Sequence, residues 1–167
     1  MAWFAGAAAI GCLVLGLVHL WRLFTGPAAE RAGETSAAAA AIGMAAMFSP
    51  IGDPVPLPVW IALYTVCAGW TAVLVVRRRA DDAPHGGPVH HLLCSAAMVF
   101  MLVGHGGHGA ELGLLSVMAL VGAGYFAWHG LRCADTYRLA PGGPPRTVAG
   151  AHLAGAVTMS GMLVAMI

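Results

Sequence analysis

Methionine pairs recur three times in this sequence at the same spacing. Each pair has the form Met-x-x-Met, and the pairs are Met44/Met47, Met98/Met101 and Met159/Met162. A thioether sulfur is neutral and soft, so it binds Cu(I) well and Zn²⁺ or Mg²⁺ poorly. Two or three such sulfurs can hold Cu(I) without burying a compensating charge. The repeated pairs therefore predict a site for a soft monovalent metal.

Histidines extend two of these pairs into longer stripes. His91 and His152 each precede the first methionine of a pair by seven residues, and His105 follows Met101 by four. On a helix, residues at offsets of seven, ten and fourteen lie on one face. The predicted metal ligands are Met44, Met47, Met98, Met101, Met159, Met162, His91, His152, His105 and His108, the last two in Gly104-His-Gly-Gly-His-Gly.

The same stripes suit an alternative cofactor, haem b. His91 and His105 are fourteen residues apart, and His152 and Met166 repeat that separation. His91 with His152 would ligate an inner haem. His105 with Met166 would ligate an outer haem, because His/Met ligation is known for haem iron. The chain would then be a small electron carrier, but the methionine pairs would crowd the space between two porphyrins. Cu(I) is therefore the primary prediction.

The elements that must position these side chains are membrane-spanning helices. The sequence is 59% apolar and 9% charged, whereas a soluble domain has about a quarter of its residues charged. A helix of about 20 apolar residues crosses a bilayer core, and it satisfies its own backbone hydrogen bonds there. We predict an all-α membrane protein with six spans at 2–22, 35–50, 56–76, 89–104, 112–131 and 148–167.

The spans pair into three repeated hairpins, at about 1–50, 56–104 and 112–167, within one domain covering 1–167. The first and fifth spans also end alike, in His19-Leu-Trp-Arg and His129-Gly-Leu-Arg. A pseudo-threefold bundle would stack the methionines in two layers, provided that the three helices adjoin. These layers are Met44/Met98/Met159 and Met47/Met101/Met162. The small residues of 35–50 favour a place inside the bundle for the second span.

The arginines predict the orientation. Every basic residue falls in the first, third or fifth connection or at its edge: Arg22, Arg31, Arg77, Arg78, Arg79, Arg132, Arg138 and Arg146. The other connections carry only the acidic Asp53 and Glu111. The positive-inside rule then puts both termini outside. Aromatic belts would follow, with Trp3 and Trp60 at the outer interface and Trp21, Trp128 and Tyr137 at the inner one. Composition suggests a bacterial cytoplasmic membrane.

Several functions lack support in the sequence. No nucleotide-binding loop, aspartyl-phosphate motif or catalytic triad pattern occurs, and no basic patch indicates nucleic acid. Neither Asp nor Glu lies in the middle of a predicted span. We therefore expect no catalytic residues and no enzyme. The expected partners are the lipid bilayer and a copper donor or acceptor protein. A third interpretation is a non-catalytic subunit or assembly factor of a larger membrane complex.

The repeated His/Met helices resemble two kinds of known protein. As a whole-chain pattern, they are similar to an uncharacterised actinobacterial family of small six-span membrane proteins, which implies the fold but no activity. In their chemistry, the methionine layers resemble copper uptake channels, whose MxxxM helices converge as a trimer. The spacing here is MxxM and the three copies lie in one chain. This second likeness is therefore one of chemistry, and no residue is carried over from it.

Overall fold

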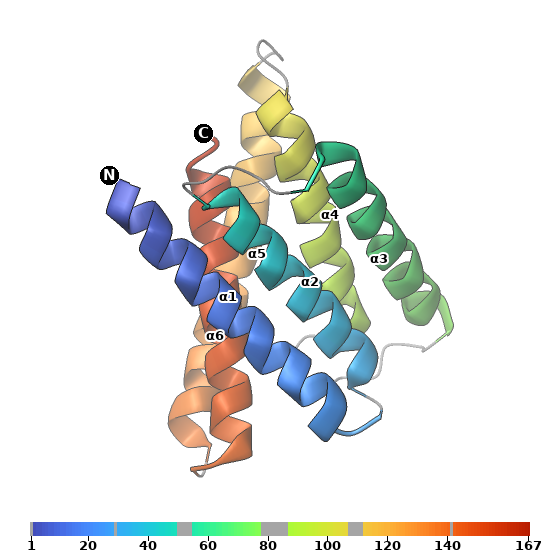
Figure 1. Cartoon of the computed structure of the whole chain (residues 1–167), viewed down its shortest axis with the longest axis vertical. Helices are drawn as coiled ribbons and strands as arrows, with labels where there is room; N and C mark the ends of the chain where they lie inside the picture. The colour runs from blue at the N-terminus through green and yellow to red at the C-terminus, as the bar shows by residue number, and fades with distance from the viewer. Residues whose placement is uncertain (1, 29, 50–54, 78–86, 107–111, 141) are drawn as a thin grey trace. The chain divides into compact units, whose positions relative to one another are not determined.

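Six α-helices account for most of the chain in the computed structural model (Figure 1). The structure describes residues 2–28, 30–49, 55–77, 87–106, 112–140 and 142–167. The helices are α1 (Ala2–Thr25), α2 (Arg31–Met47), α3 (Leu57–Arg77), α4 (Gly87–Gly106), α5 (Leu112–Leu139) and α6 (Pro144–Val164). The described residues contain no strand. The predicted all-α class with six helices is confirmed.

Five of the described helices, all except α2, are long and apolar enough to cross a membrane. Large apolar side chains such as Leu17, Val66 and Leu131 are exposed on them, as expected where lipid replaces water around the protein. The chain is therefore a multi-pass membrane protein. Helix α2 has 17 residues and is about 26 Å long, slightly less than the hydrocarbon core.

The chain forms two compact units, Met1–Val99 and Phe100–Ile167. In the first unit, α1 packs along α2, and a Cβ atom at Gly16 would lie 3.0 Å from Cγ1 of Ile42. Small residues on both helices allow this close approach. Seven residues of α2 are buried: Glu34, Ser36, Ala38, Ala40, Ala41, Gly43 and Met44. The expectation that this helix lies inside its bundle holds within the first unit.

Helix α3 contacts α2 through Tyr64, on which a second aromatic residue of α3 stacks. The hydroxyl of Tyr64 donates a hydrogen bond of 2.9 Å to the carbonyl oxygen of Ala39. Trp60 stacks on Tyr64 at a centroid distance of 6.0 Å and is buried. The place of Trp60 in an outer aromatic belt stays a prediction, but its ring faces the protein and not lipid, because it packs against the Tyr64 ring. Trp3, Trp21 and Trp128 are exposed.

The second unit contains the hairpin of α5 and α6, together with the end of α4. Small residues line the contact between α5 and α6. A Cβ atom at Gly130 would lie 3.6 Å from Cβ of Ala156, and one at Gly122 would lie 3.0 Å from Leu163. The hydroxyl of Ser160 donates a hydrogen bond of 3.0 Å to a backbone carbonyl of α5. A helix pair of this kind packs tightly without large side chains.

Helix α5 continues eight residues past its predicted end at 131. Two cation–π contacts support this extension, with Arg132 over Trp128 at 5.3 Å and Arg146 over Tyr137 at 4.6 Å. Helix α6 begins four residues earlier than predicted, because prolines suit its first turn. The preceding Gly143 has a φ of 99°, which favours glycine.

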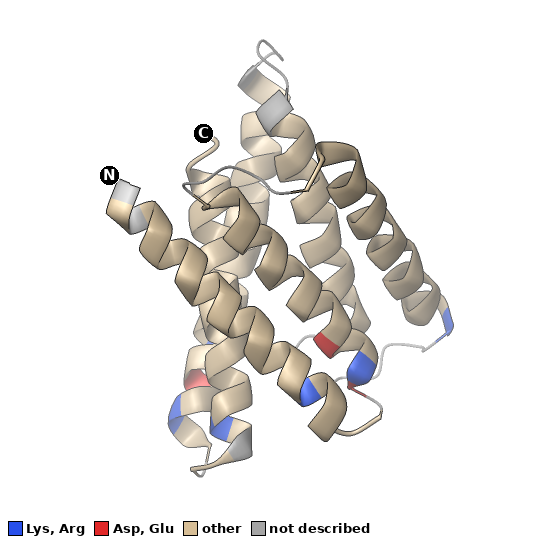
Figure 2. Ribbon diagram, viewed as in Figure 1, with Lys and Arg blue, Asp and Glu red and all other residues tan. Residues whose placement is uncertain are grey.

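The charged residues that the structure describes lie toward one end of the helices in each unit (Figure 2). In the first unit they lie at the end of α1, the start of α2 and the end of α3. In the second unit they lie at the end of α5 and the start of α6. Among the described residues, each unit by itself thus has its charges at one end and apolar helices beyond it, which is the charge distribution expected of a helical hairpin in a bilayer.

Candidate metal-binding residues and a buried ion network

Two members of the predicted ligand stripe of α4, His91 and Met98, lie against α2. A Cβ atom at Gly33 would lie 2.6 Å from Nε2 of His91, and one at Gly43 would lie 3.0 Å from Cε of Met98. The two α2 glycines thus accommodate an imidazole near one end of the helix and a thioether near the other. Since His91 and Met98 both reach α2, the periodicity correctly placed them on one face of α4.

Two serines lie between this histidine and this methionine on the same interface. Oγ of Ser36 on α2 lies 3.4 Å from Oγ of Ser95 on α4, and both residues are buried. The Ser95 hydroxyl also donates to the carbonyl oxygen of His91. Along the interface between α2 and α4, the order of side chains is therefore an imidazole, two hydroxyls and a thioether. Within the first unit, α2 and α4 adjoin as the methionine layers require.

The predicted methionine ligands differ in burial. Met98 and Met101 have no exposed surface, and Met44 and Met159 are 2% exposed. Met47 and Met162 are half-buried. Met44 directly follows Gly43, the α2 residue that Met98 approaches. Met159 and Met162 belong to the second unit, so the layers that include them remain a prediction.

The predicted histidine ligands occupy different settings. His91 and His152 are half-buried, in α4 and α6 respectively. His105 lies in the last turn of α4, but its side chain is outside the described part of the structure, and His108 lies outside the described residues altogether. Among the described residues, no three His, Cys, Asp or Glu side chains gather closely enough to hold a metal ion.

Two of the predicted haem ligands are pressed against helix backbones. Nε2 of His91 lies 2.6 Å from the position of a Cβ atom at Gly33. Cε of Met166 lies 2.6 Å from the corresponding position at Gly104. A porphyrin on either ligand would need the helix backbone to move away.

Two histidine–cysteine pairs that were not among the predicted ligands lie in contact. Nε2 of His90 lies 3.5 Å from Sγ of Cys94 on α4. Nε2 of His129 lies 3.5 Å from Sγ of Cys133 on α5. Each cysteine follows its histidine by four residues, so helical geometry puts them one turn apart. The spacing His-x-x-x-Cys, present twice, is the signal that could have identified them.

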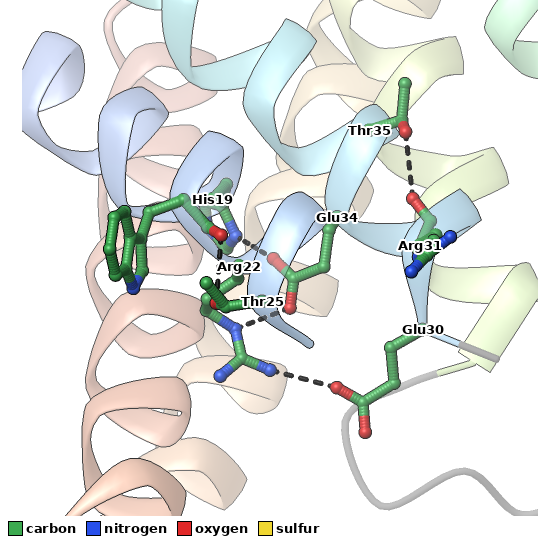
Figure 3. A network of polar contacts seen from close by, with 8 residues as sticks. His19, Arg22, Thr25, Glu30, Arg31, Glu34 and Thr35 are labelled. Atoms are coloured by element: carbon green, nitrogen blue, oxygen red, sulfur yellow. Dashed lines mark hydrogen bonds and ion pairs between the residues drawn. The ribbon is translucent and has the colours of Figure 1, made fainter. Parts of the chain in front are cut away.

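A buried ion network centred on Glu34, which was not among the predicted functional residues, joins α1 to α2 (Figure 3). Glu34 is 5% exposed. Its Oε2 accepts a hydrogen bond of 2.7 Å from Nδ1 of His19, and its Oε1 accepts one of 2.6 Å from Nε of Arg22. Nη2 of Arg22 also donates to Glu30 at 2.9 Å. The sequence placed Glu34 just before a span and so gave no reason to expect its burial.

The surroundings of Glu34 favour its ionised form. Glu34 precedes the predicted membrane-spanning segment 35–50. Burial raises the pKa of its carboxyl, but hydrogen bonds and charges from His19 and Arg22 outweigh that effect. The pKa is therefore lower than its usual value of 4.5. An ionised carboxylate that accepts hydrogen bonds from both partners locks the end of α1 to the start of α2.

Comparison with known proteins identifies the family and nothing finer. No curated protein and no solved structure matches the chain. The model of one family, described as a domain of unknown function (DUF5134), matches residues 29–167. This match covers all of the described helices except α1. The chain therefore belongs to the DUF5134 family.

Proposed function

We propose that this protein binds Cu(I) inside the membrane through methionine and histidine side chains, for copper transport, handling or delivery. The observation that carries the proposal is the contact between α2 and α4. His91 and Met98 lie on one face of α4 and approach α2 at Gly33 and Gly43.

The electrostatics of this interface favour a soft monovalent ion. Met98 and Met44 are almost completely buried, and an uncompensated divalent charge at such a place would be costly. Thioethers and imidazole are neutral ligands that bind Cu(I) well. A single positive charge is the smallest that a metal ion can bring into this site. Cu(I) therefore fits better than Zn²⁺ or Mg²⁺.

We further propose that the chain crosses a bacterial cytoplasmic membrane six times, with both termini outside. The charged ends of the two units and the one-sided arginines support this topology. The predicted segment 35–50, most of which lies in α2, would be the sixth span. Its partners α1 and α3 and its buried alanines support an interior position, which relieves a short helix of contact with lipid. Copper would then enter or leave through the bundle without a nucleotide-driven step.

X-ray absorption of the copper-loaded full-length protein tests the proposed function. We expect sulfur scatterers around Cu(I) that diminish in the double variant Met44→Leu/Met98→Leu. Leucine preserves core volume, so this change costs little stability. Met118→Leu is the matched control, because Met118 is 56% exposed on α5 and belongs to no MxxM pair. Unchanged sulfur scattering in the double variant would show that Met44 and Met98 only pack.

An absorption spectrum of the membrane-extracted protein separates copper from haem. We expect no Soret band and a copper content that rises on loading with Cu(I). A near-stoichiometric Soret band that shifts on reduction would replace copper with haem. A colourless protein that takes up no copper after loading would leave a subunit or assembly factor of a membrane complex as the function.

A further inference from the structure

Two thiol–imidazole pairs recur in the chain with the same internal geometry. In each pair, a cysteine lies one helical turn after a histidine, and Sγ is 3.5 Å from Nε2. His90 is buried and Cys94 is half-buried, whereas His129 and Cys133 are both buried. All four cysteines of the chain are free. Cys12 and Cys67 have no histidine at this spacing.

The two donor atoms of each pair are close enough to become ligands of one metal ion. For a nitrogen ligand at about 2.05 Å and a sulfur ligand at about 2.3 Å, the two atoms lie about 3.6 Å apart at a tetrahedral angle and about 4.35 Å apart on opposite sides of a two-coordinate ion. The observed 3.5 Å in both pairs is close to the first value and about 0.85 Å short of the second. Both side chains of a pair lie on the same helix, so their rotation can open this gap for a two-coordinate ion that replaces the thiol proton.

We propose that His90/Cys94 and His129/Cys133 are two Cu(I) sites, each formed by one thiolate and one neutral imidazole. On binding, the S–H bond breaks, a sulfur–copper bond forms, and the proton leaves to the aqueous buffer. No electron is transferred. The choice of ion rests on the proposed function, but the donor atoms are different, since neither pair includes a methionine.

Charge balance selects Cu(I) over Zn²⁺ at these pairs. One thiolate cancels the charge of Cu(I), so the loaded site is neutral, as a position inside a membrane helix favours. Zn²⁺ would retain a positive charge and needs about four ligands. Among the described residues, no third His, Cys, Asp or Glu joins either pair to form such a group. A soft ion that accepts few ligands is the one these pairs can hold.

The pairs lie toward the charged ends of their helices. His90 is in the first turn of α4, and Cys133 follows Arg132 in α5. In the proposed topology these ends are cytoplasmic. The pairs would therefore exchange Cu(I) with a cytoplasmic donor or acceptor, whereas the thioethers near Gly43 hold the ion deeper in the bilayer.

Titration of the full-length protein with Cu(I) tests this inference through the ultraviolet charge-transfer absorption of a copper–thiolate bond, which thioethers do not produce. We expect the absorption in the unmodified protein and its loss in Cys94→Ser/Cys133→Ser. The matched control is Cys67→Ser/Cys12→Ser, because Cys67 is half-buried like Cys94 and Cys12 is buried like Cys133. This control should keep the full absorption.

Two further variants test whether a loss of the thiolate absorption could come from misfolding or from the methionine site. His90→Gln/His129→Gln keeps all thiols, and we expect its Cu(I) affinity at the thiolate sites to fall at least about tenfold. Met44→Leu/Met98→Leu should keep the thiolate absorption even though it loses thioether ligands. An absorption that persists in Cys94→Ser/Cys133→Ser, or disappears equally in Cys67→Ser/Cys12→Ser, would overturn the proposal. If Met44→Leu/Met98→Leu shows unchanged sulfur scattering in X-ray absorption but the thiolate absorption behaves as expected, the proposed methionine site fails and the thiolate sites stand.

Discussion

Nδ1 of His19 lies 2.7 Å from Oε2 of Glu34, and both side chains are buried between α1 and α2. This contact joins the last part of the first helix to the first turn of the second. Arg22 binds the other carboxylate oxygen, so Glu34 serves two partners at once. The α1–α2 hairpin is therefore held at its charged end by one carboxylate.

Removing that charge should weaken the hairpin. We expect Glu34→Gln to lower the free energy of unfolding by about 2 kcal/mol, because two charge-assisted hydrogen bonds lose their ionised acceptor. Glu30→Gln is the control, since Glu30 pairs with Arg22 but is half exposed, and it should cost less than about 1 kcal/mol. Thermal unfolding in detergent compares the two variants. Equal effects would mean that the buried carboxylate has no special role.

The same carboxylate should make stability depend on acid. The pKa of Glu34 is lower in the folded protein than its usual value of 4.5. Its stabilising contribution is therefore fully present above that pH and is lost as the pH falls through the folded pKa. Melting temperatures measured across the acidic range should drop more steeply in the unmodified protein than in Glu34→Gln. Parallel pH profiles would contradict the assignment.

Glycine at position 43 should be required for the packing of α2. A Cβ atom there would collide with the Tyr64 hydroxyl, which is hydrogen-bonded to Ala39, and would crowd Met98. We expect Gly43→Ala to lower the free energy of unfolding by about 1–3 kcal/mol through overpacking. Gly69→Ala should be tolerated, since nothing lies within 4 Å of its added Cβ atom. Similar losses in both variants would rule out a specific contact at Gly43.

The hydroxyl of Ser160 should contribute to the α5–α6 hairpin. It donates a hydrogen bond to Ala123 of α5, so Ser160→Ala should cost about 0.6 kcal/mol, the average for an interhelical bond in a membrane. Thr158→Val is the control, because the Thr158 hydroxyl bonds only to Ala154 in its own helix among the contacts found. A helix-unfolding titration in mixed micelles gives both values. A larger loss for Thr158→Val would contradict this prediction.

The proposed topology makes a prediction for two loops. Single cysteines introduced at Asp53 and Arg78, in a background without the native cysteines, should react with an impermeant thiol reagent from opposite sides of the membrane. The reason is that all arginines fall in alternate connections. Measuring labelling in intact cells and in inverted vesicles decides the question. Labelling of both positions from one side would overturn the six-span arrangement.

The number of helices and the all-α class followed from the sequence, because an apolar run of about 20 residues satisfies its backbone hydrogen bonds in lipid as a helix. The six expected spans correspond to the six helices, and the face shared by His91 and Met98 followed from a periodicity that any helix imposes. Boundaries were less exact. The extension of α5 depends on contacts of Arg132 and Tyr137, which apolar content alone does not encode.

Only the tertiary structure decided which polar side chains are buried and what they contact. The sequence suggests that Glu34 is an exposed charge beside a membrane boundary. In the structure, α1 packs on α2, and Glu34 is hydrogen-bonded to His19 and Arg22. The sequence suggests a membrane interface for Trp60, and only the structure shows that its ring is buried on Tyr64. The physical reason is that local pattern sets a residue's face and depth along a helix. Its neighbour on that face depends on how helices distant in sequence approach one another.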